Sequence, residues 1–214
     1  MTKLIAIIDY GIGNVFSVVR ACEQCGVEAQ LVDSVAQIQS ASHIILPGVG
    51  AFGKGMHELE TRGFVEAIKL HATKQKPLLG ICLGMQLLLD ESDEFGKTKG
   101  LGIIPGKVIA IPSSGSSGKI HKIPHIGWNE LKKTASGSDW SESILYDVKE
   151  DVSTYFVHSF TAFPNSAKHR LADVDYDGCQ ISAVIQDGNI YGCQFHPEKS
   201  GSEGLKILKA FLEI

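Results

Sequence analysis

Two short motifs, more than a hundred residues apart, contain the side chains that a thiol catalyst needs. The first is GICLGMQ (80–86), in which Cys82 lies midway between Gly80 and Gly84. A G-x-C-x-G pattern is the cysteine analogue of the nucleophile elbow, where a strand turns sharply into a helix and glycines leave room beside the nucleophile. The helix N-terminus would lower the pKa of the thiol, and the N–H of Leu83 could donate to an oxyanion. Taken alone, the motif also fits a buried cysteine at a strand end with incidental glycines.

The second motif, QFHPEK (194–199), contains a base and a group to orient it. His196 and Glu198 are two residues apart, so in an extended segment they share a face, roughly 6.5–7 Å apart along the backbone. Pro197 favours an extended conformation at His196. His196 could therefore take a thiol proton while Glu198 holds its imidazole, which is the logic of a catalytic triad. Either residue alone also fits an exposed strand end. Together with the elbow at Cys82, the two residues become a specific signal for a catalytic triad.

The remaining cysteines are predicted to be structural. Cys22 and Cys25 form a C-x-x-C pair late in a helical run that Gly26 would end, whereas redox pairs usually lie at helix N-termini. No second pair completes a zinc site. We predict helix packing for this pair, and core positions in strands for Cys179 and Cys193.

The other histidines do not predict a metal centre. His121 and His125 are four apart, but Pro124 prevents a helical pair of ligands. His158, in YFVHSF, ends an expected strand and is predicted to line the site. The DYGIGN loop (9–14) lacks the third glycine of a dinucleotide fingerprint, because Phe16 stands in its place. We therefore predict neither a metal nor a cofactor.

The first half of the chain alternates strand and helix patterns, which predicts a mostly parallel sheet with helices on both faces. Strands are expected at 4–10, 27–33, 43–48 and 77–81, and helices at 14–25, 56–74 and 83–94. Sites in such sheets lie at the carboxyl ends of the strands. The loops that leave those ends should converge, and they are DYGIGN, PGVGAFG (47–53) and GICLGMQ.

The second half is rich in strand patterns and closes with a helix. Strands are expected at 107–111, 125–133, 153–163, 169–178, 179–188 and 189–196, and the helix at 202–214. The Asp-Gly pair in QDGN (186–189) predicts a hairpin. Residues 112–119 are rich in Gly and Ser and are expected to form an exposed, flexible loop. With no interdomain linker, residues 1–214 are predicted to be one α/β domain with a β-rich second half.

Composition excludes several classes of protein. The formal charge of −4 argues against nucleic-acid and membrane-surface binding, because both targets are anionic. No run approaches the ~20 apolar residues of a membrane span, and the N-terminus lacks the pattern of a signal peptide. The odd number of cysteines, five, argues against a disulfide framework. A cytoplasmic location is predicted.

These motifs resemble the class I glutamine amidotransferases. GICLGMQ and QFHPEKS are similar to that family's Cys and His-x-Glu motifs, and the likeness runs from DYGIGN to HPEKS, nearly the whole chain. PGVGAFGKGM, IGWN and YFVHSF are similar to one branch, the glutaminase subunits of imidazole glycerol phosphate synthase in histidine biosynthesis. The resemblance implies a flavodoxin-like fold and hydrolysis of glutamine through a cysteine thioester.

The resemblance also implies roles for individual residues. Cys82 would attack the glutamine amide, His196 would serve as base and then acid, and Glu198 would hold His196. The oxyanion would be held by the loop at 48–50 together with Leu83. The residues expected to contact substrate are Gly48, Val49, Gly50, Leu83, Gln86 and the main chain of His158, Ser159 and Phe160.

A partner is implied as well, because the chain has no second domain to consume ammonia. The resemblance implies a separate (β/α)₈ cyclase subunit in a heterodimer, with Asn14 and Trp128 near the interface. Turn capping and core packing are the structural alternatives for these two residues. Residues 111–123 are longer than the usual connection in the family, which leaves partner contacts there open.

Other functions stay open at this point. A paralogue could supply ammonia to a different synthase, such as a sugar amidotransferase, with the same catalytic residues. A catalytically silent binding module on the same fold is opposed by the intact Cys82, His196 and Glu198. A cysteine protease shares the triad logic, but the glutamine-type loops oppose it.

Overall fold

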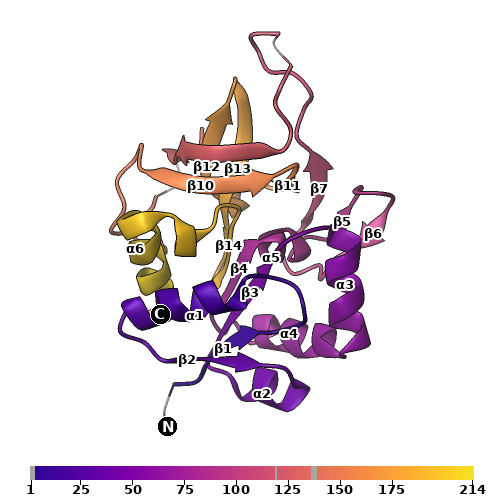
Figure 1. Cartoon of the computed structure of the whole chain (residues 1–214), viewed down its shortest axis with the longest axis vertical. Coiled ribbons are helices and arrows are strands. Elements are labelled where there is room, and N and C mark those ends of the chain that lie inside the picture. Colours follow the sequence, from indigo (N-terminus) through magenta and orange to yellow (C-terminus); the bar gives the residue numbers. More distant parts are fainter. Residues whose placement is uncertain (1–2, 119, 136–138) are drawn as a thin grey trace.

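The computed structural model describes residues 3–118, 120–135 and 139–214, and its centre is one eight-stranded sheet (Figure 1). The strand order is β2-β1-β3-β4-β14-β13-β12-β9. Neighbouring strands are parallel from β2 to β14 and antiparallel from β14 to β9. The bounds are β1 Ile5–Ile8, β2 Ala29–Val32, β3 His43–Gly48, β4 Leu78–Cys82, β9 Lys132–Lys133, β12 Arg170–Tyr176, β13 Cys179–Asp187 and β14 Ile190–Cys193.

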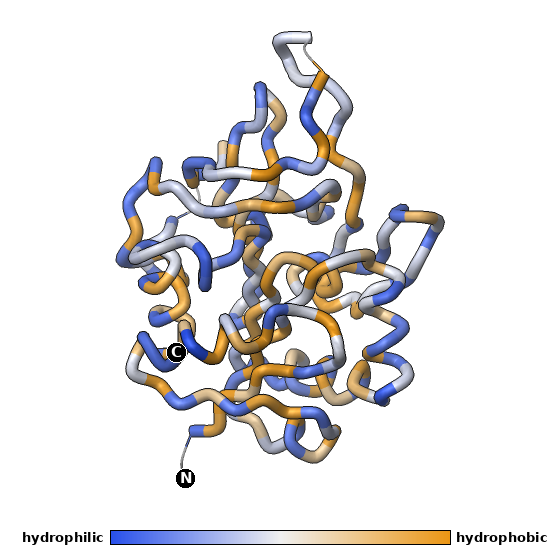
Figure 2. The backbone as a smooth tube through the Cα atoms, in the orientation of Figure 1, coloured by the Kyte–Doolittle hydropathy of each residue, from blue (hydrophilic) through white to orange (hydrophobic). Residues whose placement is uncertain are grey.

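Helices cover both faces of the parallel half, as predicted. Alternate residues of β1 enter different hydrophobic clusters, Ile5 and Ile7 with the helices α1 and α6, Ala6 and Ile8 with α2, α3 and α4. Figure 2 shows hydrophobic residues running through the central strands beneath these helices. The bounds are α1 Val15–Gln24, α2 Val35–Ser40, α3 Phe52–Thr61, α4 Phe64–Thr73, α5 Leu83–Leu87 and α6 Gly201–Leu212.

The β-rich second half adds two smaller sheets beside the main one. An antiparallel ribbon pairs β8 with β10, and a second sheet has the order β11-β7-β5-β6. The bounds are β5 Glu91–Ser92, β6 Thr98–Lys99, β7 Gly106–Ala110, β8 His125–Glu130, β10 Ser153–His158 and β11 Phe160–Pro164, with 3-10 turns η1 Ala167–His169 and η2 Pro197–Lys199. The hairpin predicted at QDGN joins β13 to β14.

Several predicted elements are interrupted. The helix expected at 56–74 is two helices, because Gly63 adopts a left-handed conformation (φ 71°) between α3 and α4. The helix expected at 83–94 ends at Leu87, and Glu91 already belongs to β5. The strands expected at 125–133 and 153–163 break at Leu131 and Ser159. Helix α2 was not predicted.

The remaining cysteine and loop predictions are partly confirmed. Cys22 and Cys193 are buried, but Cys179 is only half-buried at the start of β13, so its predicted core position is wrong. Its sulfur lies 3.9 Å from the Ser114 carbonyl oxygen, in the Gly/Ser-rich loop. That loop is largely exposed, and Lys119 within it lies outside the described residues.

Within the described chain no helix has the length and apolar character needed to cross a membrane.

The three loops predicted to converge do meet at one edge of the sheet. A side chain at Gly13 would lie 3.5 Å from the backbone of Gly48. A side chain at Gly48 would overlap the hydroxyl of Tyr10 and lie 3.0 Å from Leu83. Small residues therefore allow the ends of β1, β3 and β4 to pack against each other.

Candidate active site

The turn from β4 into α5 is a sharp elbow centred on Cys82. Its backbone has φ 55° and ψ −110°, a conformation rarely adopted by residues other than glycine. A side chain at Gly80 would come 2.6 Å from the Gly84 carbonyl group, and one at Gly84 would overlap the Leu46 carbonyl oxygen. Both glycines are therefore required by close backbone packing, and the elbow predicted from GICLGMQ is confirmed.

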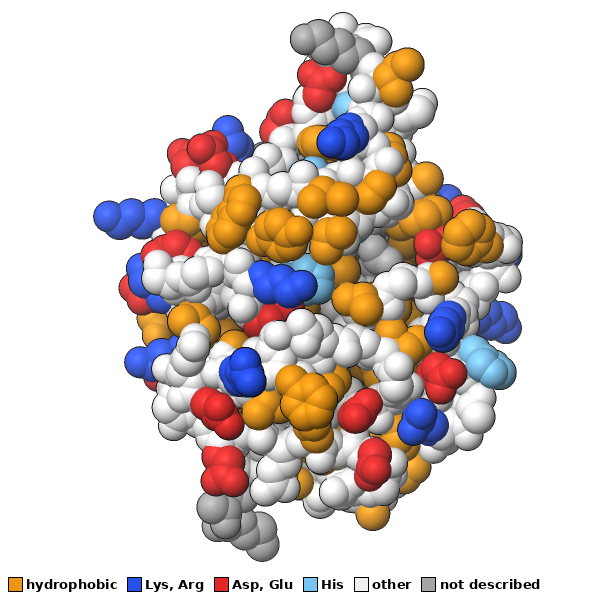
Figure 3. All heavy atoms as spheres, viewed as in Figure 1, with side chains coloured by type: hydrophobic (Ala, Val, Ile, Leu, Met, Phe, Trp, Pro, Cys, Tyr) orange, Lys and Arg blue, Asp and Glu red, His pale blue; other side chains and the backbone are white. Residues whose placement is uncertain are grey.

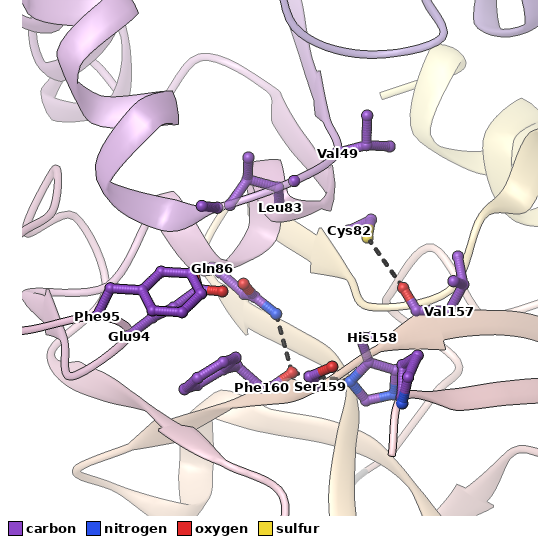
Figure 4. Close-up of a pocket in the computed structure, with 13 residues that line it drawn as sticks. Val49, Cys82, Leu83, Gln86, Glu94, Phe95, Val157, His158, Ser159 and Phe160 are labelled. Atoms are coloured by element: carbon purple, nitrogen blue, oxygen red, sulfur yellow. Dashed lines mark hydrogen bonds between the residues drawn. The ribbon is translucent and has the colours of Figure 1, made fainter. Parts of the chain in front are cut away.

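The Cys82 thiol lies at the bottom of a cavity, with only 6% of the residue exposed. Its sulfur is 3.9 Å from the Val157 carbonyl oxygen and 3.8 Å from the side-chain nitrogen of Gln194 (Figure 4 shows the first contact). Leu83 begins α5 directly after the thiol, so its N–H belongs to the first turn, where helix amides have no intrahelical acceptor.

His196 and Glu198, the predicted base and its orienting group, follow β14, the strand next to β4. Cys193 is in register with Ile81, which brings the segment after β14 beside the elbow. His196 Nδ1 lies 2.8 Å from Glu198 Oε1, and both side chains are almost fully buried. His196 Nε2 makes no well-formed hydrogen bond within the described chain, so it is available for a proton.

The charge state of His196 depends on these neighbours. Burial alone would lower the pKa of His196, but the Cys82 thiol and the Glu198 carboxylate raise it to about 9. The arrangement can therefore hold an imidazolium at neutral pH beside the sulfur of Cys82. A thiol, an imidazole and a carboxylate are thus adjacent in space, as a nucleophile, a base and an orienting group would need to be, although 114 residues separate Cys82 from His196.

The cavity in front of Cys82 has a volume of about 500 Å³ (Figure 4). It is lined by residues that the sequence predicted for substrate contact, namely Val49, Gly50, Leu83, Gln86, His158, Ser159 and Phe160. Gly48 lies beneath the lining, against Tyr10 and Leu83. His196 and Glu198 are not part of the cavity wall.

Sequence reasoning missed four residues of the site: Glu94, Phe95, Pro124 and Gln194. The first three line the cavity. Glu94 Oε2 accepts a 2.7 Å hydrogen bond from the N–H of Phe52, the first residue of α3. The pattern of residues 83–94 predicts one continuous helix, whereas α5 ends at Leu87 and the chain then turns so that Glu94 lines the cavity. Gln194 had a usable signal, because it lies two residues before His196 in a strand-like run.

The amide of Gln86 has a fixed orientation. Its nitrogen donates to the Phe160 carbonyl oxygen at 2.9 Å and to the side-chain oxygen of Gln194, also at 2.9 Å. Both hydrogens of the amide are therefore used. The oxygen of Gln86 remains as an acceptor on the side of the cavity (Figure 4).

The two residues predicted near a partner lie on the surface. Asn14 is exposed and its side chain does not cap α1, so turn capping does not explain it. Trp128 is 56% exposed, so core packing does not explain it. Ile126, also on the outer face of β8, is 57% exposed, and Phe16 in α1 is 70% exposed. Figure 3 shows hydrophobic side chains gathered over the β8–β10 ribbon.

The described residues contain no cluster of His, Cys, Asp and Glu suited to a metal ion.

Comparison with known families and sequences gives a consistent result. The family model described as glutamine amidotransferase class-I matches residues 6–214. An imidazole glycerol phosphate synthase subunit HisH 1 from Legionella pneumophila (strain Lens) is 54% identical over 98% of this chain and 99% of the relative. A HisH subunit from Caldanaerobacter subterraneus subsp. tengcongensis is 45% identical over 99% of this chain and 98% of its own length.

Solved structures share the fold at low sequence identity. A crystal structure of a glutamine amidotransferase has a TM-score of 0.74 and 16% identity, covering 99% of this chain and 98% of the other. The structure of PurLQS from Thermotoga maritima has a TM-score of 0.70 and 20% identity, covering 100% and 99%. At these identities the likeness concerns the fold alone, and it agrees with the α/β class predicted from the sequence.

Proposed function

This chain belongs to the class I glutamine amidotransferases, among the HisH subunits of imidazole glycerol phosphate synthase, and from that premise we propose the following reaction for it. The protein hydrolyses glutamine to glutamate and ammonia and passes the ammonia to a separate cyclase subunit in histidine biosynthesis. The observation that carries the proposal is the elbow thiol of Cys82 beside the buried pair of His196 and Glu198.

The chemistry begins with proton transfer from Cys82 to Nε2 of His196. The thiolate attacks the carbon of the glutamine side-chain amide, and the tetrahedral intermediate collapses as His196 returns its proton to the leaving ammonia. His196 then takes a proton from water, which attacks the thioester and releases glutamate and the free thiol. Glu198 holds the Nδ1–H of His196 through both steps, because its oxygen lies 2.8 Å away.

The negative charge of each intermediate needs N–H donors. Leu83 supplies one from the first turn of α5, and the segment from Gly48 to Gly50 supplies the other from across the cavity mouth. Loss of a single donor of this kind typically reduces kcat by ~10²–10³. Val49 and Gly50 line the cavity on the side of the thiol, which supports this assignment.

The cavity also offers acceptors for the amino-acid end of glutamine. The Glu94 carboxylate and the free oxygen of Gln86 both face it, and an ammonium group carries only donors. We assign the substrate ammonium to these two groups. The wall formed by His158, Ser159 and Phe160 completes the pocket with main-chain atoms.

The partner would dock over the exposed apolar residues beside the cavity. Trp128 and Ile126 from β8 and Phe16 near Asn14 supply the hydrophobic anchors that protein interfaces favour. We propose that the glutaminase activity stays weak until this partner binds. We further propose that residues 1–214 form one domain, supported by the single sheet that joins both halves, and that the protein works in the cytoplasm.

The decisive experiment measures glutamine hydrolysis with and without the cyclase and its nucleotide substrate. Activity should rise when both are added, and Cys82→Ala should reduce it by about 10³ or more. Cys25→Ala is the matched control, because Cys25 is half-buried in the α1 C-terminus, where its sulfur contacts the Leu205 carbonyl oxygen at 3.5 Å. Activation by a different synthase alone would identify a paralogue. Activity that survives Cys82→Ala would exclude this nucleophile, and peptide cleavage would indicate a protease.

A further inference from the structure

Two histidines that the catalytic mechanism does not use form a buried pair, and one of them, His158, lines the cavity. In the β8–β10 ribbon His125 lies directly opposite His158, so their side chains share a face. His125 Nδ1 is 3.0 Å from His158 Nε2, and both residues are buried. A hydrogen bond between two imidazoles requires one donor and one acceptor, so the protonation pattern of the pair matters.

The neighbours at each end determine that pattern. The side-chain nitrogen of Asn129 lies 3.1 Å from His125 Nε2 and 3.4 Å from the Asp175 carbonyl oxygen, which fixes it as the donating end of the amide. At the other end, His158 Nδ1 is 2.8 Å from the Phe160 carbonyl oxygen, which can only accept. Both histidines are therefore neutral with the hydrogen on Nδ1, and burial lowers the pKa of His125 to about 4 and that of His158 to about 3.

The result is a chain of hydrogen bonds that all point the same way. Asn129 donates to His125, His125 to His158, and His158 to the Phe160 carbonyl oxygen. The same oxygen accepts from Gln86 (Figure 4), whose nitrogen also donates to Gln194. The chain thus runs from the half-buried part of β8 to a residue of the cavity wall.

We propose that His125 is a positioning residue for glutamine recognition, acting through His158 and the Phe160 carbonyl group to keep the oxygen of Gln86 turned towards the substrate ammonium. This inference rests on the proposed function, because it assigns the ammonium of glutamine to Gln86 and Glu94. If His125 no longer donates, His158 can move its hydrogen to Nε2. The Phe160 carbonyl oxygen then faces the lone pair of Nδ1 at 2.8 Å instead of a hydrogen, and the repulsion displaces the oxygen from the position in which it accepts from Gln86.

The ring of His125 allows the hydrogen bonds to be removed separately from the packing. It lies between Phe156, with ring centroids 5.2 Å apart and nearly parallel, and Tyr176, at 4.2 Å. His125→Phe keeps an aromatic ring in this stack but has no hydrogen-bonding group. His125→Asn places an amide nitrogen near the position of Nδ1, so it can still donate to His158.

The experiment compares two substrates in the complex with the cyclase. One is glutamine, and the other is the monoamide of glutaric acid, which has the same reacting amide but no α-amino group. His125→Phe should raise KM for glutamine about five- to tenfold, in line with the weakening of a hydrogen bond to a charged group rather than its complete loss, with kcat nearly unchanged. KM for the monoamide should not change, and His125→Asn should restore most of the glutamine affinity.

His121→Phe is the matched control. His121 is also buried and stacks on Tyr176, but it bonds to the Pro112 carbonyl oxygen and takes no part in the chain. His121→Phe should lower the Tm about as much as His125→Phe does, but it should leave KM for glutamine unchanged. Should His125→Phe not fold, Asn129→Leu removes the outermost donor at a half-buried position and should raise KM two- to threefold.

Two results would overturn the inference. A lower Tm with unchanged KM for glutamine would make His125 a packing residue only. An equal rise in KM for both substrates would mean general damage to the pocket. Failure of the proposed function itself would look different, because the unaltered complex would then not hydrolyse glutamine at all.

Discussion

At the scale of single residues, Gln194 connects Cys82 to Gln86 in the wall of the cavity. Its nitrogen lies 3.8 Å from the Cys82 sulfur, and its oxygen accepts from Gln86. The proximity of the Cys82 elbow and the His196–Glu198 pair could be predicted from sequence, because a cysteine between two glycines and a His-x-Glu pair rarely occur together in a chain that only packs them; their catalytic roles stay a prediction. Gln194 and Glu94 could not be predicted, because a glutamine and a glutamate acquire a role only from what the fold places around them.

One residue-scale prediction concerns the charge of the substrate cavity. Glu94→Gln keeps an oxygen for the N–H of Phe52 but removes the carboxylate that faces the ammonium. KM for glutamine should rise roughly tenfold, because a hydrogen bond to a charged group contributes about 1.5–3 kcal/mol. Steady-state kinetics of the activated complex would check this. Glu91→Gln, which removes a partner of Lys97 outside the cavity lining, should have no such effect.

At the scale of elements, periodicity identified the strands and helices better than their ends. Helix α4 begins only after the left-handed Gly63, and α5 stops after five residues, where Leu88 and Leu89 turn the chain towards β5. The run LGMQLLLDESDE has the composition of a longer helix. Tertiary packing overrides that tendency, since all residues from Leu83 to Leu89 are buried.

The elbow gives a prediction about two glycines that differ in their surroundings. Gly80→Ala would force a methyl group to within 2.6 Å of the α5 backbone, so it should lower the free energy of unfolding by several kcal/mol and reduce glutaminase activity. At Gly53, in helix α3, an added methyl group would meet only the Thr98 hydroxyl, at 3.5 Å. Gly53→Ala should therefore raise the free energy of unfolding by about 0.5–1 kcal/mol. Denaturant unfolding of both variants would test this. Equal stabilities would contradict the packing argument.

At the scale of the whole molecule, burial keeps several histidines neutral. It lowers the pKa values of His43, His71 and His125 to about 4 and that of His158 to about 3, below the ordinary 6.5. Because the unfolded chain binds protons more readily at these positions, their stabilising contribution is complete above pH 6.5 and is lost as pH falls towards 4. His196 behaves oppositely, because its pKa is raised to about 9, and its contribution is lost between pH 6.5 and 9.

The free energy of unfolding should therefore be greatest near pH 6.5–7 and fall more steeply on the acid side. Each neutral histidine contributes up to about 1.4 kcal/mol per pH unit to that slope. Guanidinium titrations from pH 4.5 to 9 would measure it. His71→Gln keeps a donor for the Pro77 carbonyl oxygen and should make the acid slope shallower. A slope that is the same in the variant would show that His71 is not kept neutral.

The position of β14 has a consequence for how the protein is made. This strand is the last in the chain, yet it lies in the middle of the sheet, with β4 on one side and β13 on the other. During synthesis Cys82 leaves the ribosome long before His196 does. Until β14 has been made, β4 has an unpaired edge on the side where β14 will bind. A nascent chain therefore carries the proposed nucleophile before its proposed base. The proposed hydrolysis of glutamine therefore requires that the final strand has already been inserted between β4 and β13.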